Sequence, residues 1–186
     1  MEKNIINLLK KISLLFIANE LPYMIIGGQA VLYYGNPRLT QDIDITLGFD
    51  NSIRKKIIEF FEMNNFKILP KNPDEFILET NVLPVQDIPT KIRVDLIFSF
   101  SEYEKIAVNR AIDVIIERVP VKFAAIEDLI IHKLFAGRPR DIEDIEIVIK
   151  KNKSKIDVKY IENWLPQFLE IPGKENLIAL FNQLMI

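Results

Sequence analysis

Two aspartates separated by one residue, Asp42 and Asp44, carry the clearest chemical signal in the chain. Side chains alternate along a β-strand, so both carboxylates would point to the same face of a strand. Adjacent carboxylates repel each other unless a cation lies between them, and magnesium prefers oxygen ligands of this kind. The dipeptide Gly27-Gly28 precedes them and lacks Cβ atoms, so its backbone N–H groups can approach a phosphate closely. The combination predicts a site for a divalent metal and a nucleoside triphosphate.

A third carboxylate, Asp95, lies at the centre of residues 91–98, a run rich in β-forming residues. Metal-dependent transfer to a hydroxyl needs a further acid, either to hold a second ion or to accept the hydroxyl proton. An acid within an apolar strand is costly to bury unless it is paired or bound to metal. Other interpretations stay open: a salt bridge to Arg93 or an edge-strand position for Asp95, and a solvated acidic strand end at Asp42 and Asp44.

The elements that position these residues are expected to alternate between helices and strands. A helix over 3–19 precedes a short buried strand over 24–26, and another short helix over 29–34 follows the glycines. A helix over 52–63 has Asn51 or Ser52 as its N-cap. Prolines at 70, 73, 84 and 89 mark turns in a meander of strands. The expected strands cover residues 66–69, 75–80 and 91–98, with a further hairpin or edge strand within 111–123.

After residue 124 the pattern becomes helical. Amphipathic helices are expected over 158–169 and 175–185, separated by Pro172-Gly173. The lysine-rich segment 150–155 is typical of a solvated linker or helix end, and RNA contact is its alternative interpretation. The sequence therefore predicts an α/β catalytic core over 1–124 and a helical C-terminal subdomain over 125–186 that contributes to the active site.

The residues Gly27, Gly28, Asp42, Asp44 and Asp95 resemble the signature of the polymerase-beta-like nucleotidyltransferase superfamily. That resemblance implies a small mixed β-sheet flanked by helices, and two magnesium ions bound by the three aspartates. It also implies transfer of a nucleoside monophosphate from an NTP to an acceptor hydroxyl, with release of pyrophosphate. The first two carboxylates would bind metal and phosphates, and the third would complete the second metal site and activate the acceptor. Many members have serine at the position of Gly28, so backbone amides would replace that hydroxyl.

The segment 126–144 resembles the distal motif of the AbiEii-type branch, the nucleotidyltransferase toxins of abortive-infection and toxin-antitoxin systems. The residues before the Asp pair, including Arg38 and Thr40, also resemble that branch, and both are expected to bind the nucleotide. The resemblance implies that Lys133 contacts the triphosphate and that Asp141 helps to arrange the site, with Arg140 nearby. The acceptor would be RNA such as tRNA, a protein or a small molecule, and a cognate antitoxin would be a partner.

Helical spacing gives an independent interpretation of the same segment. Lys133 lies beside a core-facing apolar stripe, so its stem can pack while its ammonium stays free to reach a phosphate. Arg138 and Arg140 can clamp phosphates or an RNA backbone. An intramolecular ion-pair network that includes Arg140, Asp141 and Asp144 explains the segment equally well.

The 186 residues are 49% hydrophobic and 27% charged, the balance of one globular domain or of one domain with a helical tail. The chain has no cysteine, which excludes disulfides and thiolate metal sites. Its amphipathic N-terminus lacks a signal-peptide core, and no apolar run is long enough to span a bilayer, so a cytoplasmic protein without a membrane partner is expected. The alternative to an active enzyme is a catalytically inactive nucleotide-binding module acting in a two-component protein pair.

Overall fold

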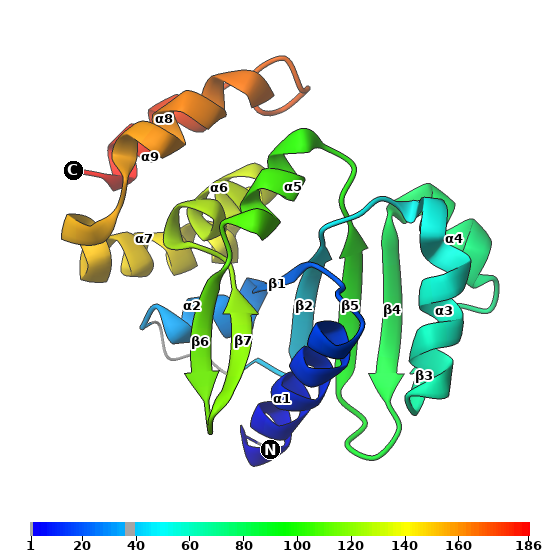
Figure 1. Cartoon of the computed structure of the whole chain (residues 1–186). Coiled ribbons are helices and arrows are strands. Elements are labelled where there is room, and N and C mark those ends of the chain that lie inside the picture. Colours follow the sequence, from blue (N-terminus) through cyan, green and yellow to red (C-terminus); the bar gives the residue numbers. More distant parts are fainter. Residues whose placement is uncertain (1, 36–39) are drawn as a thin grey trace. The chain divides into compact units, whose positions relative to one another are not determined.

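The computed structural model describes residues 2–35 and 40–186, and the chain divides into two compact units. The first unit contains Met1–Gln29 and Leu39–Ala124, and the second contains Ala30–Arg38 and Ala125–Ile186. Figure 1 labels the helices and strands in chain order. None of the helices in the described part of the chain is long and apolar enough to cross a membrane.

The first unit is built on a mixed seven-stranded sheet, which confirms the predicted α/β class with a mixed sheet. Its strands lie in the order β3-β4-β5-β2-β1-β7-β6. The pairs β1·β7 and β2·β5 are parallel, and the other neighbours are antiparallel. The strands are β1 (Tyr23–Ile26), β2 (Asp42–Leu47), β3 (Phe66–Ile68), β4 (Val82–Asp87), β5 (Arg93–Phe98), β6 (Ile112–Ile116) and β7 (Val119–Phe123).

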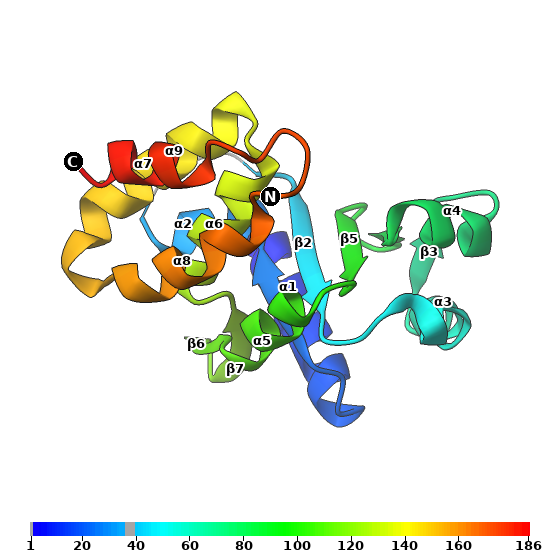
Figure 2. The ribbon, with the colours of Figure 1, turned by 90° about the horizontal axis from the view of Figure 1, so that it is seen from above.

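One face of this sheet is apolar and covered by helices. Ile43 and Ile45 of β2 are fully buried there, because residues that alternate with the aspartates point away from them. Figures 1 and 2 show α1 (Glu2–Ala18) and α3 (Arg54–Met63) on the same side of the sheet. The ring of Phe16 on α1 lies 6.0 Å from that of Phe61 on α3. Burial of each such side chain contributes about 1.5–3 kcal/mol and anchors β2 with its carboxylates on the opposite face.

The predicted strand over 75–80 is wrong, because this segment forms the helix α4 (Pro73–Thr80). Pro73 occupies the first turn, where its missing N–H costs nothing, and Asp74 and Glu75 are favoured there by the helix dipole. Asn81 ends the helix in the left-handed conformation and donates its N–H to the carbonyl of Ile77. The helical start and stop signals therefore override the β-propensity of the segment.

Pro84 does not mark a turn, because it lies within β4. Its carbonyl accepts a hydrogen bond from the N–H of Leu69 at 3.1 Å. Since the nitrogen and carbonyl of one strand residue point to the same side, the nitrogen of Pro84 points away from β5. Strand β3 has ended at Ile68 on that side, so the missing N–H falls outside the paired residues of β3 and β4.

Helix starts account for two further differences from the predictions. The helix expected from 52 opens as a 3-10 turn (Asn51–Ile53) capped by Asp50 rather than by Asn51 or Ser52, and the N–H of Ser52 donates to Oδ1 of Asp50 at 2.9 Å. A helix was also not predicted where the structure has α5 (Glu102–Asn109). Ser101 and Glu104 form a capping box at its start, a signal that can be found from sequence.

The second unit is helical, and α2 (Gly27–Tyr33) runs into it from the first. Asn152 donates Nδ2 to the carbonyl of Tyr34 at 3.0 Å, which fixes the end of α2 to that of α7 within this unit. Phe181 and Leu165 are buried in its core. The other helices are α6 (Ile126–Ala136), α7 (Pro139–Asn152), α8 (Val158–Trp164), which continues as a 3-10 turn (Leu165–Phe168), and α9 (Leu177–Leu184).

Candidate active site

The carboxylates of Asp42, Asp44 and Asp95 share one face of the sheet. Strands β2 and β5 are parallel neighbours, and their register places Asp44 opposite Asp95 and Asp42 opposite Arg93. Directly opposed residues on adjacent strands point to the same side of a sheet, with the strands about 4.8 Å apart. The structure thus brings together the three acids that the sequence assigned to the metal site.

Gly27 lies against the second of these carboxylates. Its φ of +62° belongs to the left-handed region, where residues with a Cβ are strained. A Cβ built on Gly27 would lie 1.9 Å from Oδ2 of Asp44, so any side chain here would displace that carboxylate. Gly27 therefore has two physical reasons to be glycine, and Gly28 is buried next to it in the first turn of α2.

Two polar side chains fix the start of β2. Thr40 is buried, and its Oγ1 donates a hydrogen bond to Oδ1 of Asp42 at 2.9 Å. Gln29 donates Nε2 to the carbonyl of Asp42 at 3.2 Å. The contribution of Gln29 was missed from the sequence, because nothing in its spacing indicates that this helix residue contacts the backbone of β2. Arg38, which the sequence assigned to nucleotide binding, lies outside the described residues.

Arg93 is the cation that the structure adds to this carboxylate face. Its Nε donates to Oδ1 of Asp95 at 2.8 Å, so the salt bridge considered as an alternative for Asp95 is present. This hydrogen bond raises the pKa of the Arg93 guanidinium above its usual value, and the charges of Asp42 and Asp44 raise it further. The Arg93 side chain is 55% exposed, so the pair is worth no more than about 1 kcal/mol.

The chemistry of the three acids fits magnesium. They offer hard oxygen atoms on one face, and Gly27 leaves the space that a side chain would fill beside Asp44. Within residues 2–35 and 40–186, no group of three or more His, Cys, Asp or Glu side chains is placed so that it could hold a metal ion by itself. Magnesium is commonly held by one or two carboxylates together with water and substrate phosphates. The protein oxygens here would therefore form part of a coordination shell that the triphosphate completes.

In the second unit, Lys133 on α6 is buried, and its ammonium is bound by two carboxylates of α7. Its Nζ lies 2.7 Å from Oδ1 of Asp141 and 2.8 Å from Oδ2 of Asp144. Arg138 donates Nε to the other oxygen of Asp141 at 2.6 Å. The expectation of a free ammonium at Lys133 is therefore wrong, although its contact with a triphosphate stays a prediction.

This arrangement is an ion-pair network of the kind that was the alternative interpretation, with Lys133 and Arg138 as its cations. Burial raises the pKa of Asp141, but the hydrogen bonds from Arg138 and Lys133 outweigh it and bring the pKa below its usual value. Arg140 is exposed on α7, where its predicted role in nucleotide binding also stays a prediction.

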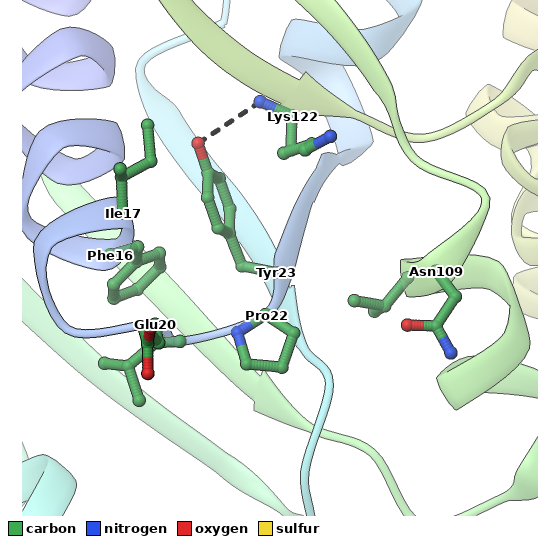
Figure 3. Close-up of a pocket in the computed structure, with 9 residues that line it drawn as sticks. Phe16, Ile17, Glu20, Pro22, Tyr23, Asn109 and Lys122 are labelled. Carbon is green, nitrogen blue, oxygen red and sulfur yellow. Dashed lines mark hydrogen bonds between the residues drawn. The ribbon is translucent and has the colours of Figure 1, made fainter.

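A cavity of about 310 Å³ lies in the first unit, away from the carboxylates. Figure 3 shows Phe16, Pro22 and Asn109 among its lining residues, with the hydroxyl of Tyr23 accepting the N–H of Lys122 at 3.2 Å. Tyr23 is the first residue of β1, whereas Gly27 follows its last residue. The cavity therefore lies at the opposite end of β1 from the predicted metal site and contains none of the predicted site residues.

Several proteins of known structure share this fold. An antigenic nucleotidyltransferase-like protein from Paracoccidioides brasiliensis is similar with a TM-score of 0.59 and 14% identity, covering 94% of this chain and 91% of that one. The antibiotic-resistance factor ANT(2'')-Ia is similar with a TM-score of 0.54 and 18% identity, covering 97% of this chain and 90% of that one. The lincosamide antibiotic adenylyltransferase LnuA has a TM-score of 0.50 and 18% identity, covering 84% of this chain and 98% of its own.

The sequence itself identifies the family. A family model described as "Nucleotidyltransferase of unknown function (DUF6036)" matches residues 3–167, so the chain belongs to this family. The comparison with curated proteins gave no match. Membership supports the superfamily that the sequence motifs resemble, while the identities of the structural neighbours are too low to carry more than the fold.

Proposed function

We propose that this protein is a magnesium-dependent nucleotidyltransferase that transfers a nucleoside monophosphate from an NTP to an acceptor hydroxyl and releases pyrophosphate. One observation carries the proposal: Asp42, Asp44 and Asp95 lie on one face of β2 and β5, next to a glycine that leaves room for Asp44. The family description and the shared fold support the same reaction class.

Each carboxylate has a proposed role that follows from its position. Asp42 and Asp44 would hold metal and phosphates, while Thr40 orients Asp42 through its hydrogen bond. Asp95 would contribute to a second metal site and accept the proton of the attacking hydroxyl. Bound magnesium would neutralise the charge that develops on the transferred phosphoryl group. Backbone N–H groups at Gly27 and Gly28 would contact the triphosphate.

The proposal includes two classes of acceptor. The resemblance of the segment 126–144 to the AbiEii-type branch supports a toxin role, with tRNA or a protein as acceptor and an antitoxin as partner. In that role Lys133, Arg140 and Asp141 would serve the nucleotide site. Two of the similar structures instead contain adenylyl-2''-tobramycin and lincomycin, which makes small-molecule acceptors a second class to test.

The test is transfer of label from each α-labelled NTP, with magnesium, to separate pools of tRNA, total RNA, lysate protein, tobramycin and lincomycin. Wild-type protein should label one of these pools, and Asp44→Asn should reduce labelling by at least about 100-fold, a loss typical of removing one electrostatic group at such a site. Asp113→Asn, which removes an exposed carboxylate on β6, is the matched control and should retain activity. Labelling that persists in Asp44→Asn would contradict the assigned site.

A second candidate is a catalytically inactive module that binds nucleotide within a two-component pair. The observation that favours it is Arg93, which already neutralises the third carboxylate through its hydrogen bond to Asp95. Magnesium-dependent NTP binding without labelling of any acceptor pool would support this function over the enzyme. Absence of NTP binding would contradict both functions.

A further inference from the structure

Arg93 is surrounded by the same acids that would bind metal. It is directly opposite Asp42 on β2, and its Nε is bonded to Oδ1 of Asp95 two residues further along β5. Across the sheet on its other side is Gln86 of β4, whose Nε2 donates to the carbonyl of Lys91 at 3.1 Å. The charged partners of Arg93 are therefore the acids of β2 and β5, whereas its neighbour on β4 is neutral.

A guanidinium and a metal ion compete for the same carboxylate. Arginine donates N–H groups to a carboxylate from about 2.8 Å, whereas magnesium binds a carboxylate oxygen at about 2.0–2.1 Å. Oδ1 of Asp95 is occupied by Nε of Arg93 in the structure. A metal that uses this oxygen therefore has to displace Arg93.

Moving the Arg93 side chain away from Asp95 costs little free energy. Arg93 is 55% exposed, so its guanidinium can move into solvent without unpacking the core. The carboxylate of Asp95 is 19% exposed and is placed by a strand whose neighbouring residues, Val94 and Leu96, are fully buried. The cation is the mobile member of the pair and the acid is the fixed one.

We propose that Arg93 is a positioning residue that takes the place of a metal ion in the metal-free protein. It neutralises the carboxylate cluster and holds Asp95 on the site face, then gives up this oxygen when metal binds. Metal loading is thus an exchange of one cation for another rather than addition to an empty site. This inference rests on the proposed function, because it assumes that Asp95 contributes to a metal site.

The experiment measures Mn²⁺ binding by electron paramagnetic resonance of the free ion, with and without NTP and against a protein-free blank, since Mn²⁺ accepts the same carboxylate ligands as Mg²⁺. Arg93→Gln removes the competing charge, so its Mn²⁺ dissociation constant should fall roughly threefold to tenfold relative to wild type. Arg93→Lys keeps the charge and should stay within about twofold of wild type. The melting temperature of metal-free Arg93→Gln should drop and should recover as Mn²⁺ is added.

Lys67→Gln is the matched control. Lys67 of β3 lies opposite Gln86, which lies opposite Arg93, so it loses the same charge from the same face two strands away. Its Mn²⁺ affinity should equal that of wild type. If wild type binds Mn²⁺ and Arg93→Gln binds it equally well or more weakly, the role of Arg93 is overturned while the proposed function stays intact. Failure of every variant to bind Mn²⁺, with or without NTP, would overturn both.

Discussion

Gly27 and Asp44 depend on each other although one belongs to a helix start and the other to a strand. The carboxylate of Asp44 fills the space where a side chain of residue 27 would be, and the backbone of Gly27 adopts a conformation that other residues avoid. A substitution at either position therefore changes the surroundings of the other. This coupling links a motif in the sequence to the geometry of the carboxylate face.

Gly27→Ala should abolish magnesium-dependent NTP binding and lower the free energy of unfolding by more than backbone strain alone accounts for. Gly173→Ala is the control, because Gly173 also has positive φ, of +82°, but has no atom within 4 Å of an added Cβ. It should lose only about 1–2 kcal/mol, the cost of a left-handed residue with a side chain. Urea unfolding and equilibrium dialysis with labelled NTP measure the two effects. Equal losses for both variants would contradict the close contact with Asp44.

Lys133→Met should destabilise the protein strongly, since it leaves the carboxylates of Asp141 and Asp144 buried without their shared ammonium. Breaking a buried ion pair costs about 3–5 kcal/mol, which urea unfolding measures directly. Lys122→Met breaks the pair with Asp113, whose side chains are 42% and 51% exposed, and should cost no more than about 1 kcal/mol. A Lys133→Met protein that is as stable as wild type and fails only to bind NTP would favour the triphosphate role of Lys133 over a structural one.

Strands β2 and β5 bring the site together because their register is fixed by burial. Ile43 and Ile45 alternate with the aspartates of β2, as Val94 and Leu96 alternate with Asp95 on β5, and all four are fully buried. A slip by one residue would expose these side chains and bury the acids, so it is strongly disfavoured. The shared face of Asp42 and Asp44 followed from strand alternation alone. Their pairing with β5 needed the structure, since sequence does not give the order of strands.

The errors in the sequence-based prediction have a common physical origin. Residues 75–80 are rich enough in apolar residues to suggest a strand, but Pro73 at the helix start and Asn81 at its end decide for α4. Pro84 can lie within β4 because β3 ends beside it, and the sequence alone does not show which strand is the neighbour. Lys133 was expected to be free, but the acids that bind it come from the following helix. Helical spacing within one helix does not predict how the next helix packs against it.

Asp87 stabilises the connection between β4 and β5, and this role should depend on pH. Its carboxylate accepts hydrogen bonds from Lys11 at 2.8 Å and from the hydroxyl of Thr90 at 2.6 Å. Burial raises the pKa of Asp87, but these hydrogen bonds outweigh it, so its pKa lies below the usual value. Its contribution to stability is therefore complete above about pH 4 and is lost as the pH falls through the lowered pKa.

Asp87→Asn should lower the free energy of unfolding by about 1.5–3 kcal/mol at pH 7, the range for hydrogen bonds to a charged group. At pH 2 to 3 the difference between the variant and wild type should shrink, because the wild-type carboxyl is then increasingly protonated. Urea unfolding at both pH values measures this change. A difference that is the same at pH 3 and pH 7 would show that the charge of Asp87 is not what stabilises the turn.

The molecule as a whole combines a sheet unit that carries the three acids with a helical unit that carries the buried lysine network. Composition and periodicity predicted an α/β core and a helical C-terminal part, and the family match over residues 3–167 includes most of both. The chemistry proposed for the chain rests on the sheet unit. The family match supports a nucleotidyltransferase, and the labelling experiment above tests its acceptor.

The proposed reaction at Asp42, Asp44 and Asp95 transfers a nucleoside monophosphate from the NTP to the acceptor. The most direct measurement compares two labels in the same NTP with the acceptor pool that reacts. Label in the α-phosphate should become attached to the acceptor in a magnesium-dependent manner, while label in the γ-phosphate should leave as pyrophosphate. Transfer of the γ-label to the acceptor, or release of inorganic phosphate with no labelled acceptor, would contradict the account.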